Sequence, residues 1–314
     1  MNKRNVVIFA TAFALFASGM NVKMCRDRSK EFIQYIDAYT QDIVDDDFYI
    51  SAHRGFSSLE VENTKGAISL AASKGYVDYI EFDVRMTKDN RIVLSHNNSL
   101  MKANGDLTDV SSMTYEEAIN TLFSYSPSVF SNFSFGNEEK MMMAQRYKDL
   151  RCVNYHLIGL LDGINYCGSK LMLMDLKFNN DIELFTEELL KELDGVDTRN
   201  IIFQSLNIDG IKHLQENSNY NCLALISNAS DIKRSKEFAR VGLKYNLVTY
   251  DLVSSLLAEG KTVAIWTVNS TEVLDRLISI LGDHYKDVIY ITDYPDLMTV
   301  RLHEYENGRP LVLR

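Results

Sequence analysis

Two acidic side chains lie two residues apart in residues 79–84, where apolar and acidic residues alternate. Alternation with a period of two is typical of a β-strand, whose residues i and i+2 point to the same face. We therefore expect Glu81 and Asp83 to project side by side. Adjacent carboxylates repel each other unless a cation or a proton lies between them, and such oxygen ligands suit Mg²⁺ or Ca²⁺ better than Zn²⁺. The pair predicts a divalent metal site; the alternative is an edge strand with two solvated acids.

Two histidines accompany this acid pair. The apolar segments that precede His53 and His96 are predicted to be short buried strands. Histidine is the side chain best suited to acid and base catalysis near neutral pH. Beside His53, Arg54 offers several donors to a phosphate, and Gly55 allows the backbone to turn sharply. The pattern predicts an active site that binds phosphate and moves protons. The other histidines have no such neighbours and are interpreted as surface or packing residues: His156, His213, His284 and His303.

These residues belong to a larger spaced set that resembles the glycerophosphodiester phosphodiesterase family. The resemblance covers residues 48–303, most of the chain, with the pieces in the family's order. The pieces are His53-Arg54-Gly55, Glu62-Asn63-Thr64, Glu81-Phe82-Asp83, Thr87-Lys88-Asp89, the strand ending at His96, Asp175-Leu176-Lys177, Trp266-Thr267-Val268-Asn269 and Thr292-Asp293-Tyr294-Pro295.

The resemblance implies metal-dependent hydrolysis of glycerophosphodiesters to glycerol 3-phosphate and an alcohol. It implies that Glu81, Asp83 and Asp175 together hold one divalent cation, either Mg²⁺ or Ca²⁺. It also implies that His53 and His96 share the acid and base roles, in an order that the sequence does not assign. A neighbouring hydroxyl of the glycerol can serve as the nucleophile, giving a cyclic phosphate that water then opens.

Four further residues receive expected roles from the same resemblance. Arg54 and Lys177 are expected to bind the phosphate, since both carry donors that suit phosphate oxygens. Glu62 is expected to orient this network. Trp266 is expected to pack against the glycerol or the head group of the substrate, although a single tryptophan is also a common core residue.

Three positions depart from the family's usual pattern. Asn97 follows His96 where the family normally has Asp, which removes a charge beside a predicted catalytic residue. Val61 stands where Pro is usual, and Asp175 stands where Glu is usual. None of these changes removes a central group, so we expect them to affect substrate range and rate.

Eight apolar, strand-like segments position these residues, and helical patterns such as residues 183–193 and 252–257 separate most of them. Alternating strands and helices predict a parallel α/β fold, and eight units predict a (β/α)₈ TIM barrel. Each candidate residue then falls at or just beyond the carboxyl end of a strand, where barrel enzymes keep their active sites. The predicted strands are residues 49–53, 79–84, 171–176, 201–204, 222–226, 242–246, 262–267 and 288–292.

One additional strand, the segment that ends at His96, does not fit a parallel arrangement. Only residues 85–91 separate it from the strand that carries Glu81 and Asp83. A parallel crossover needs a dozen or more residues, so we expect an antiparallel hairpin after the second barrel strand. The hairpin would return His96 to the mouth of the barrel.

An insertion is expected at residues 97–170, before the third barrel strand, because this stretch is longer than one helical connection requires. It contains a predicted helix at residues 113–122 and a polar, aromatic segment at residues 123–137. A long insertion at an active-site face often forms a lid or a wall that selects substrates. The alternative is a surface loop without such a role.

The first 28 residues differ in character from the remainder. Lys3 and Arg4 precede an uncharged, mostly apolar run at residues 6–20, which predicts a signal peptide or a membrane anchor over residues 1–28. Small residues at Ala17-Ser18-Gly19 offer a cleavage site, whereas the basic residues that follow the run argue for the alternative of an uncleaved anchor. We expect an exported or membrane-anchored protein, and the sequence does not assign the side of the membrane on which the barrel lies. Residues 29–314 are expected to form a single barrel domain.

The net charge of −10 argues against a nucleic-acid partner, because nucleic-acid binding needs a basic patch. A small or lipid-derived phosphodiester needs only a locally positive site. The composition decides neither the oligomeric state nor the redox compartment. The four cysteines can pair or remain buried thiols: Cys25, Cys152, Cys167 and Cys222.

Three functions therefore compete. The first is hydrolysis of deacylated phospholipids or of glycerol-phosphate polymers. The second is a related barrel enzyme, similar to lysophospholipase D or sphingomyelinase D, that attacks intact lipids by intramolecular cyclisation. The third is a barrel that binds phosphodiesters without catalysis, suggested only by Asn97 and Asp175. The presence of both His53 and His96 favours an enzyme.

Overall fold

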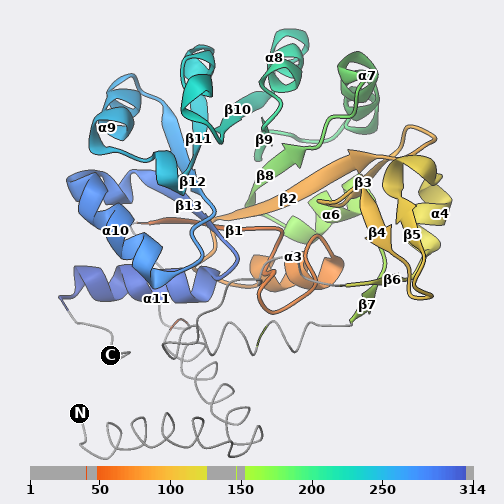
Figure 1. Cartoon of the computed structure of the whole chain (residues 1–314), viewed down its shortest axis with the longest axis horizontal. Helices are drawn as coiled ribbons and strands as arrows, with labels where there is room; N and C mark the ends of the chain where they lie inside the picture. Colours follow the sequence, from red (N-terminus) through yellow and green to blue (C-terminus); the bar gives the residue numbers. More distant parts are fainter. Residues whose placement is uncertain (1–39, 41–47, 126–145, 147–152, 309–314) are drawn as a thin grey trace, which may run out of the picture.

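Eight parallel strands close into a barrel in the computed structural model of the protein, which describes residues 40, 48–125, 146 and 153–308 (Figure 1). Each strand pairs with the next in chain order, and β1 pairs with both β13 and β2 to close the ring. The predicted (β/α)₈ barrel is thus confirmed. The strands are β1 (Tyr49–Ala52), β2 (Tyr79–Met86), β8 (Leu171–Leu176), β9 (Ile201–Ser205), β10 (Asn221–Ile226), β11 (Arg240–Lys244), β12 (Thr262–Trp266) and β13 (Val288–Thr292).

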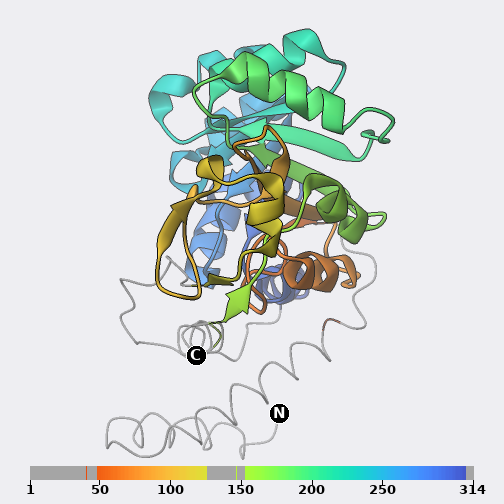
Figure 2. The ribbon, with the colours of Figure 1, turned by 90° about the vertical axis from the view of Figure 1, so that its right-hand side faces the viewer.

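Helices surround the barrel on its outside (Figures 1 and 2). Most of them begin at a Ser, Thr, Asp or Asn whose side chain accepts a hydrogen bond from a free backbone N–H of the first turn. Short 3₁₀ turns replace a helix between β10 and β11. The helices are α3 (Lys65–Ala72), α6 (Leu160–Cys167), α7 (Ile182–Glu192), α8 (Ile208–Asn217), α9 (Tyr250–Ala258), α10 (Thr271–Leu281) and α11 (Pro295–Glu306).

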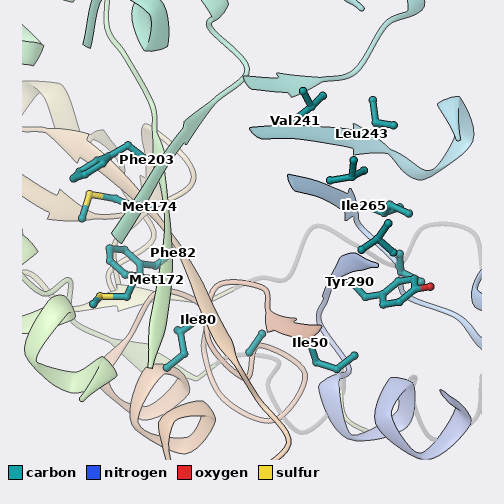
Figure 3. Close-up of a cluster of buried hydrophobic side chains, with 14 of the residues drawn as sticks. Ile50, Ile80, Phe82, Met172, Met174, Phe203, Val241, Leu243, Ile265 and Tyr290 are labelled. Atoms are coloured by element: carbon teal, nitrogen blue, oxygen red, sulfur yellow. The ribbon is translucent and has the colours of Figure 1, made fainter. Parts of the chain in front are cut away.

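Alternating strand residues divide the interior into two sets. In β2, Ile80 and Phe82 are fully buried on the outer face, in the core between strands and helices that Figure 3 shows. Glu81 and Asp83 occupy the alternate positions and are also buried. Because side chains alternate along a strand, these acids point into the barrel. A smaller apolar cluster, which includes Leu173 and Ile289, fills the barrel below them.

A ninth strand, β3 (Ile92–Leu94), pairs antiparallel with the end of β2, so that Val84 lies opposite Leu94. The backbone N–H of Ser95 donates to the carbonyl of Asp83 at 3.0 Å. This pairing returns the chain, and with it His96, to the acid-bearing part of β2.

The insertion stands at one side of the barrel, coloured yellow in Figures 1 and 2 except for its light green last strand, and has a small core of its own. Its helix α4 is shorter than the predicted helix at residues 113–122, and it starts with a capping box between Thr114 and Glu117. Residues 126–137 of the predicted polar segment lie outside the described residues. The described elements are β4 (Ser99–Met101), β5 (Leu107–Asp109), α4 (Tyr115–Asn120), β6 (Phe123–Ser124) and β7 (Asn154–Tyr155).

The remaining sequence predictions concern the N-terminal segment, the cysteines and the bounds of one strand. The predicted signal peptide or anchor at residues 1–28 lies outside the described residues, as do two of the cysteines, whereas Cys167 and Cys222 are buried thiols. Across the described part of the chain, no helix is both long and apolar enough to span a bilayer. Strand β11 runs over Arg240–Lys244 rather than over the predicted residues 242–246, because its pairing with β12 already begins at Arg240.

Candidate active site

The register between β2 and β8 brings three acids together. Asp83 and Asp175 are direct partners across the two parallel strands, and Glu81 lies two residues before Asp83 on the same face. One carboxylate oxygen from each of the three lies within 4.8 Å of the others, and all three side chains are buried. Such a cluster of oxygen donors can hold a divalent cation.

A sharp turn after β1 supports these acids. Arg54 and Gly55 both have positive φ, at 58° and 77°. A Cβ on Gly55 would lie 2.6 Å from the backbone of Ala67, so only glycine fits there. The turn aims the backbone N–H of Arg54 at Glu81 Oε2, 2.8 Å away, and that of Gly55 at the Glu81 carbonyl, 3.0 Å away. Asn63 holds Asp83 from the other side, donating to Oδ2 at 2.8 Å and accepting from the Asp83 N–H at 2.9 Å.

Two basic side chains enter the same site. Lys177 Nζ lies 2.5 Å from Asp175 Oδ2 and 2.9 Å from Asp83 Oδ1. Arg54 Nε lies 3.4 Å from Asp83 Oδ2, and Nη1 donates to both oxygens of Glu62 at 3.0 Å. The structure thus places the two predicted phosphate ligands beside the predicted metal ligands.

The pKa values of the acids follow from burial and these neighbours. Burial, followed by repulsion from Asp83, raises the pKa of Glu81 to about 8. Burial also raises the pKa of Asp175. For Asp83, burial acts in the same direction, but Lys177 and Arg54 outweigh it and lower the pKa. Burial and mutual repulsion thus disfavour the charged form of two of the three acids, a penalty that a bound cation would relieve.

His53 is held by a residue to which the sequence assigned no role. Its Nδ1 lies 2.5 Å from Asp293 Oδ1, and its Nε2 lies 3.9 Å from Glu81 Oε2. Asp293 in turn accepts hydrogen bonds from Ser57 at 3.1 Å and from Asn269 at 2.6 Å. Although burial and Arg54 lower the pKa of His53, the carboxylates of Asp293 and Glu81 raise it further than those effects lower it.

His96 has a much sparser environment. Its Nδ1 lies 3.0 Å from the side-chain oxygen of Asn97, and its backbone carbonyl accepts from Arg85 Nε at 2.9 Å. Burial lowers the pKa of His96 to about 4, against a partial opposing effect of Asp83. The imidazole is therefore neutral near pH 7.

The two remaining predicted residues differ in their surroundings. Glu62 joins the site through Arg54 and accepts a hydrogen bond from the Tyr125 hydroxyl at 3.2 Å. Trp266 instead packs against the apolar cluster inside the barrel and donates its N–H to the Gly242 carbonyl at 3.1 Å. Its expected contact with substrate stays a prediction.

Sequence reasoning missed four residues that touch the site: Asp293, Asn63, Gln204 and Tyr125. Asp293 and Asn63 lie inside motifs that carried the family resemblance, so the sequence marked their positions but did not reveal which side chains they contact. Gln204 lies opposite Asp175 across β8 and β9, and its amide approaches Glu81 Oε1 at 3.4 Å. Tyr125 belongs to the insertion, where no spacing pointed to it.

The closed barrel and an acid cluster able to hold a cation define a TIM-barrel protein with a candidate metal site. The model of the glycerophosphoryl diester phosphodiesterase family matches residues 53–297. This match spans more than half of the chain, and the protein therefore belongs to that family. The resemblance inferred from the sequence is confirmed.

The chain is similar in sequence to individual curated proteins and in fold to solved structures. The chain is 27% identical over 274 residues to the protein YhdW of Bacillus subtilis, covering 82% of this chain and 99% of YhdW. It is 35% identical over 68 residues to a lysophospholipase D of Mus musculus, covering 22% of this chain and 20% of that protein. A phosphodiesterase of Oleispira antarctica, solved with the product sn-glycerol-3-phosphate, has the same fold, with a TM-score of 0.61, 17% identity, and coverage of 81% of this chain and 96% of that one.

Proposed function

We propose that the protein hydrolyses glycerophosphodiesters to glycerol 3-phosphate and an alcohol, with the help of one divalent cation. The observation that carries this proposal is the register that sets Asp83 opposite Asp175, with Glu81 beside them and basic side chains on the same face. The family and the product bound to the Oleispira structure agree with this substrate class.

The three acids of β2 and β8 fit a divalent cation. Asp175 Oδ1 is buried and has no hydrogen-bond partner among the described residues, so it is available as a ligand. Carboxylate oxygens suit Mg²⁺ or Ca²⁺. A cation held there would bind a phosphate oxygen and offset the negative charge that develops in the transition state.

Arg54 and Lys177 would bind the remaining phosphate oxygens. Both are largely buried, with side chains 13% and 15% exposed, so their charges are screened only weakly by solvent. Glu62 fixes the guanidinium of Arg54 through two contacts of 3.0 Å. Its role is to orient that side chain.

The histidines would move two protons. One removes the proton from the nucleophile, which in a glycerol diester is the hydroxyl next to the phosphate. The new P–O bond closes a cyclic phosphate, while the bond to the departing alcohol breaks and that alcohol takes a proton from the other histidine. Water then opens the ring. Asp293 binds Nδ1 of His53, which leaves Nε2 for the transfer.

The test is glycerol 3-phosphate release from glycerophosphocholine by the full-length protein, measured with Mg²⁺, with Ca²⁺ and with EDTA. We expect metal-dependent release that falls by about 10³-fold or more in His96→Ala, because a catalytic acid or base is lost. His213→Ala, on α8 and outside the site, is the matched control and should retain full activity. Release that is insensitive to EDTA and survives in His96→Ala would contradict the proposal.

A second candidate function is cleavage of lysophospholipids. Two observations favour it: the 35% identity to a lysophospholipase D, and the exposed apolar side chains of Met101 and Leu107, which are 39% and 71% accessible and line a cavity at His96. The same assay with lysophosphatidylcholine, read as choline release, distinguishes the two. Faster turnover of the lipid than of glycerophosphocholine would favour this second function.

A further inference from the structure

A cavity of about 180 Å³ lies between the candidate site and the insertion. Glu62 forms part of its lining on the barrel side, His96 lines it where the β2–β3 hairpin ends, and residues of β4 to β7 line it from the insertion. Its position next to a predicted acid–base residue makes it suitable for one of the two groups esterified to the phosphate. Its volume is below the 300–1,000 Å³ typical of pockets for drug-sized ligands, which favours a small group.

The lining of this cavity has an unusual charge distribution. Glu62 is its one carboxylate, and none of the described residues that line it is Lys or Arg. A second acid, the exposed Asp109 of β5, accepts a hydrogen bond from the lining residue Ser99. The two basic side chains of the site, Arg54 and Lys177, contact acids instead. Arg54 is thus paired with Glu62 itself and Lys177 with the acids of the barrel, and no further Lys or Arg is among the described residues that line the cavity.

Two aromatic rings form a further part of the cavity wall. Tyr125 and Tyr155 both line it, with ring centroids 6.1 Å apart and ring planes at 89°. The Tyr125 hydroxyl is tied to Glu62 at 3.2 Å, and Tyr155 packs on Phe123 with centroids 5.8 Å apart, which fixes both rings. Aromatic faces attract ammonium groups, and quaternary ammonium groups are commonly bound in this way.

We propose that this cavity receives the departing alcohol of the diester and selects small amino alcohols with a positive charge, such as choline, over alcohols that carry an acid group. This inference rests on the proposed hydrolysis of glycerophosphodiesters. The aromatic rings attract an ammonium group, and Leu100, Met101 and Leu107 contact its methyl or methylene groups. An acidic alcohol finds no unpaired Lys or Arg among the described residues that line the cavity.

The experiment compares kcat/KM of the full-length protein for three substrates that differ only in the departing alcohol: glycerophosphocholine, glycerophosphoglycerol and glycerophosphoserine. We expect the choline diester to exceed the serine diester by about tenfold or more, as a charge difference at short range gives. Met101→Lys places a cation at the partly exposed rim of the cavity and should lower this ratio by about tenfold. Met101→Gln, similar in length and uncharged, should keep the ratio within about twofold.

A second pair of variants tests the aromatic wall. Tyr155→Leu removes the ring and should reduce the preference for the choline diester over the neutral glycerol diester by about threefold or more, whereas Tyr155→Phe retains the ring and the preference. Because each result is a ratio within one variant, partial loss of folded protein does not affect it.

The outcomes separate this inference from the proposed function. If no diester is hydrolysed, the proposed function fails and the inference fails with it. If all three are hydrolysed at similar kcat/KM, or if Met101→Lys leaves the choline-to-serine ratio unchanged, only the inference is overturned. It is also overturned if Met101→Lys alters discrimination between glycerophosphocholine and lysophosphatidylcholine instead, because the cavity would then hold the glycerol side.

Discussion

The two halves of the candidate site are built in different ways. On the barrel half, His53 binds Asp293, and Asp293 is itself held by Ser57 and Asn269. On the insertion half, the described partner of the His96 ring is Asn97, its neighbour in the chain. The first histidine is fixed by residues from three parts of the barrel rim, and the second by a hairpin and one adjacent amide.

This difference shows how the protein can keep the groups that act on the phosphate separate from those that select the alcohol. The barrel half positions its groups through strand register, which cannot shift by one residue without turning every side chain to the opposite face. The insertion half uses short strands and side chains of a separate small core. Changes in the insertion can therefore alter the bound alcohol without disturbing the acids.

The largest effect is expected from breaking the barrel half at Asp293. Asp293→Asn removes the charge that binds Nδ1 of His53 and allows the wrong tautomer, so we expect kcat to fall by about 10²–10⁴-fold. Asp287→Asn breaks a similar contact, 3.0 Å from His284, on the surface and is the matched control. Steady-state kinetics and thermal melts of both variants give the comparison; equal kcat in Asp293→Asn and the parent protein would refute the role of Asp293.

The sequence was sufficient for the acid pair of the barrel half because the signal of that pair is local. Glu81 and Asp83 alternate with buried apolar residues in one segment, and that alternation alone predicts both a strand and a shared face. Asp175 and Lys177 could be assigned to the site only through the family resemblance, because β8 carries one acid and shows no pair of carboxylates. Asp293 lies 240 residues from His53, so no spacing could reveal their contact.

The insertion half was predicted less completely for a physical reason. Strands β6 and β7 have two residues each, too short for any period to be read. The cavity depends on pairing across such strands, as between Phe123 and Tyr155. The insertion could be predicted from the length of the chain before β8, but the residues that line the cavity could not.

A second comparison concerns the two apolar cores. Phe203 lies in the barrel core and Phe123 in the insertion core, and both side chains are fully buried. Phe203→Ala should lower the free energy of global unfolding by about 3–5 kcal/mol through the cavity it leaves. Phe123→Ala should act mainly on local opening, so that hydrogen exchange speeds up around β4 to β7 with a smaller change in the global transition. Equal losses in the global transition would show that the two cores unfold as one.

A buried ion pair joins Arg146, from the stretch of chain between β6 and β7, to Asp296 of α11. Arg146 contacts Asp296 at 2.5 Å and Ser58 at 3.2 Å, and both members of the ion pair are about 2% exposed. Arg146→Met leaves Asp296 buried without its partner and should cost about 3 kcal/mol of stability in denaturant unfolding. Arg199→Met, which breaks an exposed pair with Asp197, is the control and should leave stability unchanged. If the two variants unfold at the same denaturant concentration, the pair does not stabilise this junction.

The smallest expected effect comes from making the two histidines more alike. Asn97→Asp places a carboxylate next to His96, where the structure has an amide oxygen 3.0 Å from Nδ1. A negative neighbour favours the charged imidazole, so the pKa of His96, which burial holds at about 4, should rise by about one unit. Proton NMR titration of the metal-free protein measures this midpoint directly, with Asn97→Ser as the uncharged control. An upward shift in Asn97→Asp alone would show that a missing charge separates the two histidines, whereas equal midpoints would leave burial as the cause and make the barrel half, with its Asp293, the exception.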